Sequence, residues 1–234
     1  MGTHYSPPII HDGLVFCVDA GNRKSYPGSG TTWTDLAGTN DGTISGATFS
    51  ANFGGILNFD GTNDIVTISP SSFTTLNQLS VSIWCRVESS GGGYPCLISA
   101  RNASTANDYS TGFNIDLGSA SQTSFKFLAV EGAGQGGSSD QMTDDIAFNN
   151  WTHIMVTISA DTITMKINNN VQTDRSRTNS AMGLQYINIG ARYYSGTNRG
   201  YFDGDIALIH LYNRALTESE QSQNFNAHRT RFGV

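Results

Sequence analysis

The chain has 234 residues, only 14% of them charged, and a formal net charge of −6. Gly, Ser, Thr and Asn are abundant, which is typical of strands joined by turns rather than of helices. An acidic chain without a run of basic residues is a poor partner for nucleic acid, so nucleic-acid binding is excluded from the expected functions.

The first residues of the chain carry no recognisable targeting signal. Residues 1–11 contain neither a basic segment nor an apolar one, so we expect no secretory signal and synthesis in a cytoplasm. The longest apolar run, Leu14–Val18, is too short to cross a membrane, so no membrane partner is expected. No linker divides the sequence, which predicts one domain at 13–234 after an extension at 1–12.

The first part of the chain has the pattern of short strands. Gly13–Ala20 is apolar on both faces and predicts a strand, and the polar loop that follows, Arg23–Asn40, is expected to be anchored by Trp33. Leu79–Val87 shows the clearest alternation of apolar and polar residues. Other strands are expected where turn residues bound a short apolar run: Gly42–Phe49, Ile56–Asp60, Ile65–Ile68 and Pro95–Ala100.

The middle of the chain continues the pattern with two hairpins. Five strands are expected here: Gly112–Leu117, Ser124–Val130, Trp151–Ile158, Thr162–Asn168 and Gln185–Gly190. Asn168–Asn170 predicts a tight turn into Val171–Asp174, because Asn adopts left-handed backbone at low cost. Glu131–Ala147 and Arg192–Tyr201 have turn-rich compositions and predict surface loops.

The stretch Gly200–Leu216 ends the series of strands. Its apolar residues fall on both faces, so we expect a central strand that is covered on both sides. Thr217 and Glu220 form a capping box, which predicts that a helix begins there. Twelve to fourteen short strands and one short C-terminal helix indicate an all-β, two-sheet antiparallel sandwich or jelly roll.

The three cysteines are an odd number. Cys17 and Cys85 stand at alternating positions in expected strands, where a free cysteine behaves as a small apolar residue. We expect all three to be reduced. A bridge between Cys85 and Cys96 would require that their strands be neighbours.

Several of these runs, in this order, resemble one family. The runs FDGTNDIVTI, LSVSIWCRV, NWTHIMVTIS, KINNN and GDIALIHLYNRALTESE resemble the laminin G-like (concanavalin A-like) jelly-roll domains over roughly residues 13–227. The resemblance implies a concave and a convex sheet, with loops at one rim that often bind glycans or a structural calcium ion. It does not determine the function, because this fold serves lectins, glycanases, lyases, adhesion modules and virion proteins.

The two ends carry a narrower resemblance. HDGLVFCVDAGNRKSYPGSGTTWTDLAG and NFNAHRTRFG are similar to the beginnings and ends of free-standing members found among the structural proteins of tailed phages. This resemblance implies a virion protein that is released by lysis. The expected partners are then other virion proteins, further copies of the chain in a trimer, and surface polysaccharide. An extracellular protein without a virion is the alternative localisation.

Enzymatic activity is not expected from the residues that the fold would use. Glycanases of this fold carry a Glu-x-Asp-x-x-Glu run on one strand, and none of the four glutamates, Glu88, Glu131, Glu218 and Glu220, lies in such a run. Lyases would gather Arg, His, Gln and Tyr on the concave face. His153, His210 and Tyr212 lie in expected strands, but no spacing distinguishes them from packing residues.

A calcium site of the usual family type is not expected. The candidate ligands are carboxylates near turns: Asp19, Asp60, Asp64, Asp203 and Asp205. Many relatives place an acidic residue in the last central strand, where this chain has Ala207. Asp-Gly turns explain Asp60 and Asp203 without a metal. We therefore expect no cofactor.

Aromatic and polar residues in the loops form a candidate glycan-binding set. A flat ring can stack on the apolar face of a sugar, and Asn, Asp and Arg can bind its hydroxyl groups. The candidate residues are Tyr94, Arg101, Asn102, Asp108, Tyr109, Arg192, Tyr193, Tyr194 and Arg199. The same residue types also dominate subunit contacts, so packing at a rim or an interface is the alternative interpretation.

The sequence thus predicts a non-enzymatic virion surface protein, a decoration of a capsid, fibre or tail, with a lectin-like fold and glycan-binding loops. A stand-alone carbohydrate-binding or adhesion module is the first alternative. A polysaccharide lyase or glycanase is the second.

Overall fold

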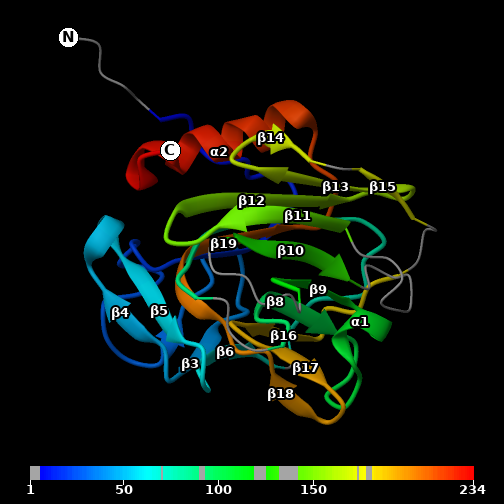
Figure 1. Cartoon of the computed structure of the whole chain (residues 1–234), viewed down its shortest axis with the longest axis horizontal. Coiled ribbons are helices and arrows are strands. Elements are labelled where there is room, and N and C mark those ends of the chain that lie inside the picture. Colours follow the sequence, from blue (N-terminus) through cyan, green and yellow to red (C-terminus); the bar gives the residue numbers. More distant parts are fainter. Residues whose placement is uncertain are drawn as a thin grey trace.

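Two antiparallel sheets lie face to face, and one helix covers the outer face of the first sheet (Figure 1). The computed structural model describes residues 6–69, 71–89, 93–118, 125–131, 142–172, 174–177 and 181–234, with the backbone alone at 125–131 and 142–144. The predicted all-β jelly-roll sandwich is confirmed.

Sheet 1 has nine strands within the described residues. Its main path runs in the order β14 (Asn170–Val171), β13 (Thr162–Ile167), β12 (Trp151–Ile158), β7 (Leu79–Val87), β19 (Asp203–Tyr212), β5 (Ile56–Asp60) and β4 (Thr48–Ser50). β1 (Leu14–Asp19) also pairs with β19, and β15 (Arg175–Ser176) also pairs with β13. The long strands at the centre of this sheet are those with the strongest apolar patterns in the sequence.

In the part of the chain that the structure describes, sheet 2 has eight strands, in the order β11 (Met142–Ala147), β10 (Phe125–Glu131), β9 (Phe113–Asp116), β8 (Cys96–Arg101), β16 (Tyr186–Ile189), β6 (Ile65–Ile68), β3 (Gly42–Ser45) and β2 (Thr32–Trp33). β17 (Arg192–Tyr194) and β18 (Thr197–Arg199) form a separate hairpin. The helical elements are η1 (Asn52–Gly54), α1 (Asp108–Thr111) and α2 (Glu218–Phe232). Within the described part of the chain, no helix combines the length and apolar character needed to cross a membrane.

The strand β19 occupies the centre of sheet 1, between β7 on one side and β5 and β1 on the other. Ile209 and Leu211 pack in the core between the sheets, whereas Ala207 and Leu208 face α2. The register of β19 against β7 shifts between Ile206 and Leu208, so two successive side chains reach the outer layer. The prediction of a central strand covered on both faces is confirmed.

The helix α2 begins at the predicted capping box. The hydroxyl of Thr217 accepts a hydrogen bond from the N–H of Glu220, and the carboxylate of Glu220 accepts one from the N–H of Thr217. The helix has 15 residues and stops at Gly233, which adopts left-handed backbone. Phe225 and Phe232 stack on Trp84 of β7, which fastens the helix to the sheet.

Two predicted loops contain strands instead. Within Glu131–Ala147, β11 pairs with β10 as the edge strand of sheet 2. An edge strand tolerates polar side chains because one side of it faces solvent. Within Arg192–Tyr201, β17 and β18 form a hairpin around Ser195 and Gly196, both with positive φ, as in a type I′ turn. Residues 132–141 lie outside the described residues.

The structure tests three further predictions. Trp33 is fully buried and anchors the first loop, as expected. Asn168 and Asn169 adopt left-handed backbone, but the strand that follows them, β14, has only two residues. Cys85 lies in sheet 1 and Cys96 in sheet 2, so the neighbouring strands that a bridge between them would need do not exist. Both thiols are buried and free, as is that of Cys17.

Candidate functional site

Polar side chains line the outer face of sheet 2 at β8, β9 and β16, although these strands are largely buried. The residues of β8, β9 and β16 that alternate with core positions are Ser99, Arg101, Asn114, Asp116, Tyr186 and Asn188. The hairpin β17–β18 and the short helix α1 lie beside these strands in Figure 1. Asn188 donates to the side-chain oxygen of Asn198 on β18 at 3.0 Å, and Ser99 donates to the carbonyl of Ala191 at 3.2 Å. The hairpin is thus fastened over the sheet by polar contacts.

Arg192 is the central buried charge of this layer, with 6% of its surface exposed. Its Nη2 atom lies 3.1 Å from Asp108 Oδ1, and its Nη1 atom lies 3.3 Å from Asp116 Oδ2. Burial raises the pKa of Asp108, although Arg192 acts to lower it. Burial opposes the charge on Arg192, but the neighbouring carboxylates raise its pKa above the usual value. The three charged groups therefore stabilise one another away from solvent.

Asp108 also holds two pieces of backbone together. Its Oδ1 atom accepts a hydrogen bond from the N–H of Tyr109 at 2.8 Å, and its Oδ2 atom accepts one from the N–H of Tyr193 at 3.2 Å. Asn107, the residue before α1, accepts a hydrogen bond from the N–H of Ser195 at 2.7 Å. Helix α1 and the tip of the hairpin are thus held in a defined relative position.

Three tyrosines surround Arg192 at the surface. The rings of Tyr94, Tyr109 and Tyr194 lie 5.5, 5.9 and 5.8 Å from its guanidinium carbon. The rings of Tyr109 and Tyr194 are 5.6 Å apart, and Arg199 lies 5.0 Å from the ring of Tyr194. Tyr94 is 37% exposed and Tyr194 is 36% exposed. We call Tyr94, Tyr109 and Tyr194 the tyrosine cluster; it presents aromatic surface above a buried cation.

The backbone around Tyr94 is held in an uncommon conformation. Tyr94 has a φ of 57°, which a bulky side chain rarely adopts. Its carbonyl packs against Gly200, where an added Cβ atom would lie 2.2 Å from that oxygen. The N–H of Cys96 donates to the carbonyl of Gly200 at 2.8 Å, which ties the two segments together. The ring of Tyr94 is therefore positioned by its surroundings and not by local preference.

The structure places the nine predicted site residues in two adjoining groups. The first group is the tyrosine cluster with Asp108, Arg192 and Arg199. The second contains Arg101, whose guanidinium carbon lies 4.1 Å from the ring of Tyr193, and the exposed residue Asn102 next to it. Asp108 and Arg192 are buried, so they support the surface residues rather than forming the surface.

Sequence reasoning missed Asp116, Tyr186 and Asn188, which complete the polar layer. The signal for them was present as an alternation of polar and apolar residues in FNID (Phe113–Asp116) and YINI (Tyr186–Ile189). This alternation indicates a polar outer face, but it does not say which loop lies on that face.

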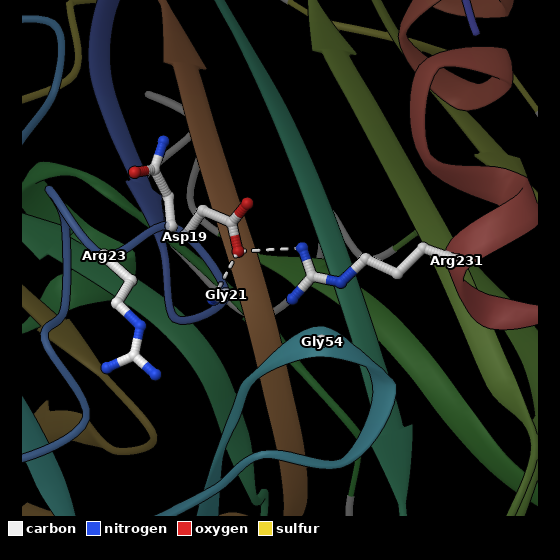
Figure 2. Close-up of a pocket in the computed structure, with 6 residues that line it drawn as sticks. Asp19, Gly21, Arg23, Gly54 and Arg231 are labelled. Atoms are coloured by element: carbon white, nitrogen blue, oxygen red, sulfur yellow. Dashed lines mark hydrogen bonds and ion pairs between the residues drawn. The ribbon is translucent and has the colours of Figure 1, made fainter. Parts of the chain in front are cut away.

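Figure 2 shows a separate cavity of about 460 Å³ near the C-terminal end of α2. It is lined by Asp19, Gly21, Asn22, Arg23, Gly54 and Arg231. Each nitrogen of the Arg231 guanidinium donates a hydrogen bond: to Asp19 Oδ1 at 2.8 Å and to the carbonyls of Phe53 and Gly55, each at 2.6 Å. The cavity has no aromatic lining residue on which a sugar could stack, and Arg231 serves to fasten α2 to the sandwich.

The candidate calcium ligands are engaged elsewhere. Asp19 pairs with Arg231, and Asp205 accepts hydrogen bonds from Arg86 at 2.6 and 2.8 Å. Asp60 and Asp64 accept backbone N–H groups within their own turn, at 2.8 and 3.0 Å. Among the described residues, no three His, Cys, Asp or Glu side chains are grouped as metal ligands would be. Four of the five candidate carboxylates are thus held in contacts within the protein.

The histidines and the tyrosine of the lyase hypothesis lie on sheet 1, His153 on β12 and His210 and Tyr212 on β19. All three side chains are buried. His153 lies 5.6 Å from the ring of Phe225, and His210 lies 5.7 Å from the ring of His228, both on α2. The arginines and tyrosines of the candidate glycan site lie beside sheet 2, at the two ends of β8, on α1 and on the β17–β18 hairpin. The structure therefore gives no common site to these histidines and the tyrosine cluster.

Comparison with known families agrees with this architecture. A laminin G sequence profile, described as the concanavalin A-like lectin/glucanases superfamily, matches residues 60–220. The chain belongs to this superfamily. The match includes the tyrosine cluster and most of both sheets. A search of curated protein sequences gave no match.

Solved structures show the same fold at low sequence identity. Domain 4 of AbnA, an extracellular arabinanase from Geobacillus stearothermophilus, in complex with arabinotriose, has a TM-score of 0.64 and 17% identity over 92% of this chain and 98% of that domain. The binding domain of botulinum neurotoxin DC in complex with SialylT has a TM-score of 0.65 and 13% identity over 93% of this chain. This chain spans about half of that binding domain, with 52% covered. These likenesses establish the lectin-like fold of the superfamily.

Proposed function

We propose that the protein is a non-enzymatic glycan-binding module, and that the tyrosine cluster with Arg199 forms its binding surface. The observation that carries the proposal is the set of exposed rings held rigidly around Arg192. Aromatic residues give large apolar contact area at a low cost in conformational entropy, which suits a shallow site for sugars.

The support comes from the geometry of the supporting layer. Asp108 fixes α1 and β17, and Gly200 fixes the backbone of Tyr94, so the three rings are positioned before any ligand arrives. A site that is already ordered loses less entropy when it binds. Two structural relatives, solved in complex with arabinotriose and with SialylT, are consistent with a glycan as ligand.

The test is a glycan array probed with the wild-type protein and with Tyr194→Ala. We expect selective signals from the wild type and a loss of at least ten-fold with the variant, because a central aromatic contact is removed. Val171→Ala is the matched control, since Val171 is 55% exposed on β14 of sheet 1. The absence of any signal on a broad array, or equal signals from Tyr194→Ala and wild type, would contradict the proposal.

We propose further that the module works on a virion, as a decoration of a capsid, fibre or tail. The proposal rests on the resemblance of the two chain ends to tailed-phage structural proteins. A trimer would give the multivalency that converts weak single contacts into useful avidity. Mass spectrometry of purified particles should detect the chain, and light scattering should give the mass of three copies. Particles that lack the chain would leave the stand-alone carbohydrate-binding module as the better description.

A further inference from the structure

Arg101 is a buried cation for which the described part of the chain shows no hydrogen-bonding partner. It is the last residue of β8 and is 6% exposed. Its guanidinium carbon lies 4.1 Å from the ring of Tyr193 and 5.4 Å from the ring of Tyr186. Its Nε and Nη1 atoms find no hydrogen-bond acceptor among the described residues. The side chain is therefore held between two rings with donor groups left over.

The contrast with Arg192 shows that this arrangement is not required by the fold. Arg192 is equally buried, but two carboxylates lie within 3.3 Å of it. A buried charge that lacks such partners lowers the stability of the folded state. Burial also lowers the pKa of Arg101, which reflects the same penalty. Methionine would fill similar space at lower cost, so the charge of Arg101 calls for a role in binding.

The surroundings of Arg101 favour an anion. Arg101, Arg192 and Arg199 carry three positive charges against the two negative charges of Asp108 and Asp116, so this cluster of five has a net charge of +1 in a chain whose net charge is −6. The N–H groups of a guanidinium match the oxygen atoms of a carboxylate, and such charge-assisted hydrogen bonds are about twice as strong as neutral ones.

We propose that Arg101 is the subsite for the carboxylate of an acidic sugar residue, such as a uronic or sialic acid, in the glycan that the tyrosine cluster binds. This inference rests on the proposed function and specifies its ligand class. Tyr193 lies over Arg101. The N–H of Tyr193 donates to Asp108, which also accepts the N–H of Tyr109 in the tyrosine cluster. One glycan chain can thus contact the exposed rings and place its carboxylate at Arg101.

The test compares ligands that differ only in charge or in the acidic residue. Oligogalacturonate is measured against its methyl ester, and 3′-sialyllactose against lactose, by calorimetry with the full chain. At least one acidic probe should bind ten-fold or more tightly than its neutral partner. Arg101→Met should reduce that affinity to the level of the neutral partner. Its melting temperature should equal that of the wild type or exceed it.

The outcomes separate this inference from the proposed function. If the wild-type protein binds glycans but does not prefer an acidic probe in either pair, the inference is wrong and the proposed function stands. If Arg101→Met retains the acidic preference, the inference is also wrong. If no glycan binds at all, both fail. If Arg101→Met does not fold, the preference of the wild type for the acidic probe still tests the inference. Arg101→Lys, which keeps the charge, should then retain part of that preference.

Discussion

Arg192 connects the tyrosine cluster to the layer beneath it. Two carboxylates neutralise its charge, and three tyrosine rings surround it. Asp108 reaches it from α1 and Asp116 from β9. Removing the guanidinium would leave two buried carboxylates without their counter-charge. The single residue thus couples the stability of the domain to the geometry of its surface.

We predict that Arg192→Met lowers the free energy of unfolding by about 3–5 kcal/mol, the usual cost of removing one partner from a buried ion pair. Urea unfolding monitored by tryptophan fluorescence measures it. Arg199→Met is the control: Arg199 is exposed, so its replacement should change the free energy by less than about 0.5 kcal/mol. Equal effects of the two variants would show that the buried ion pairs do not stabilise the fold.

At the residue scale, the sequence allowed the residue types of the site to be predicted but not their roles. Tyr94, Tyr194 and Arg199 were expected at the surface and are exposed there. Arg192 was expected as a binding residue, yet it is buried because Asp108 and Asp116 draw it inward. Such a pairing depends on contacts between residues more than 70 positions apart, which no local pattern reports.

At the element scale, the strands with strong apolar alternation were predicted well. β7, β12 and β19 lie at the centre of sheet 1, where burial on both faces imposes the pattern. Composition predicts loops at the segments that form β11, β17 and β18. β11 lies at a sheet edge, and β17 and β18 pair only with each other, so neither location requires an apolar pattern.

The capping box of α2 leads to a prediction at this scale. Thr217→Ala removes the hydroxyl that accepts the N–H of Glu220, and it should lower the free energy of unfolding by about 1 kcal/mol. The effect reaches global stability because Phe225 and Phe232 bind the helix to Trp84. Ser219→Ala, also exposed in the first turn, is the control and should have a smaller effect in the same urea titration. A Thr217→Ala protein as stable as Ser219→Ala would show that the cap is dispensable.

At the scale of the whole molecule, the two sheets have different outer layers. Sheet 1 is covered by α2 through an aromatic layer, whereas sheet 2 is covered by α1 and the β17–β18 hairpin through a polar layer. The jelly roll was predictable because its apolar strands occur in a recognisable order. The difference between the two outer layers was not predictable, because it arises from segments that pack against a face of a sheet without joining the sheet.

The layer beneath α2 contains two buried histidines and one half-buried histidine. His153 and His210 come from sheet 1 and His228 from α2 itself. Burial, together with the smaller effect of His228, lowers the pKa of His153 to about 3. Burial also lowers the pKa values of His210 and His228, the latter against the opposing effect of Asp19. His11 and Arg231 are the other cationic groups that act on this layer. All three rings are therefore neutral in the folded state at neutral pH.

These shifts predict that stability falls as the pH drops below about 6.5. Above that pH the rings are neutral in both the folded and the unfolded state. Below it the unfolded chain binds protons that the folded chain does not. Each such histidine then lowers the free energy of unfolding by about 1.4 kcal/mol per pH unit. For His153 the loss continues down to about pH 3. Urea unfolding at pH values between 7.5 and 5 measures how the free energy of unfolding changes with pH, and this range lies above the ordinary pKa values of carboxylates. His153→Gln, which can still bond Ser82, should reduce this change with pH. His11→Gln should affect it less, because burial and not His11 is the largest cause of the low pKa of His210. A free energy of unfolding that is constant over this range would mean that the histidines beneath α2 take up protons without displacing the helix.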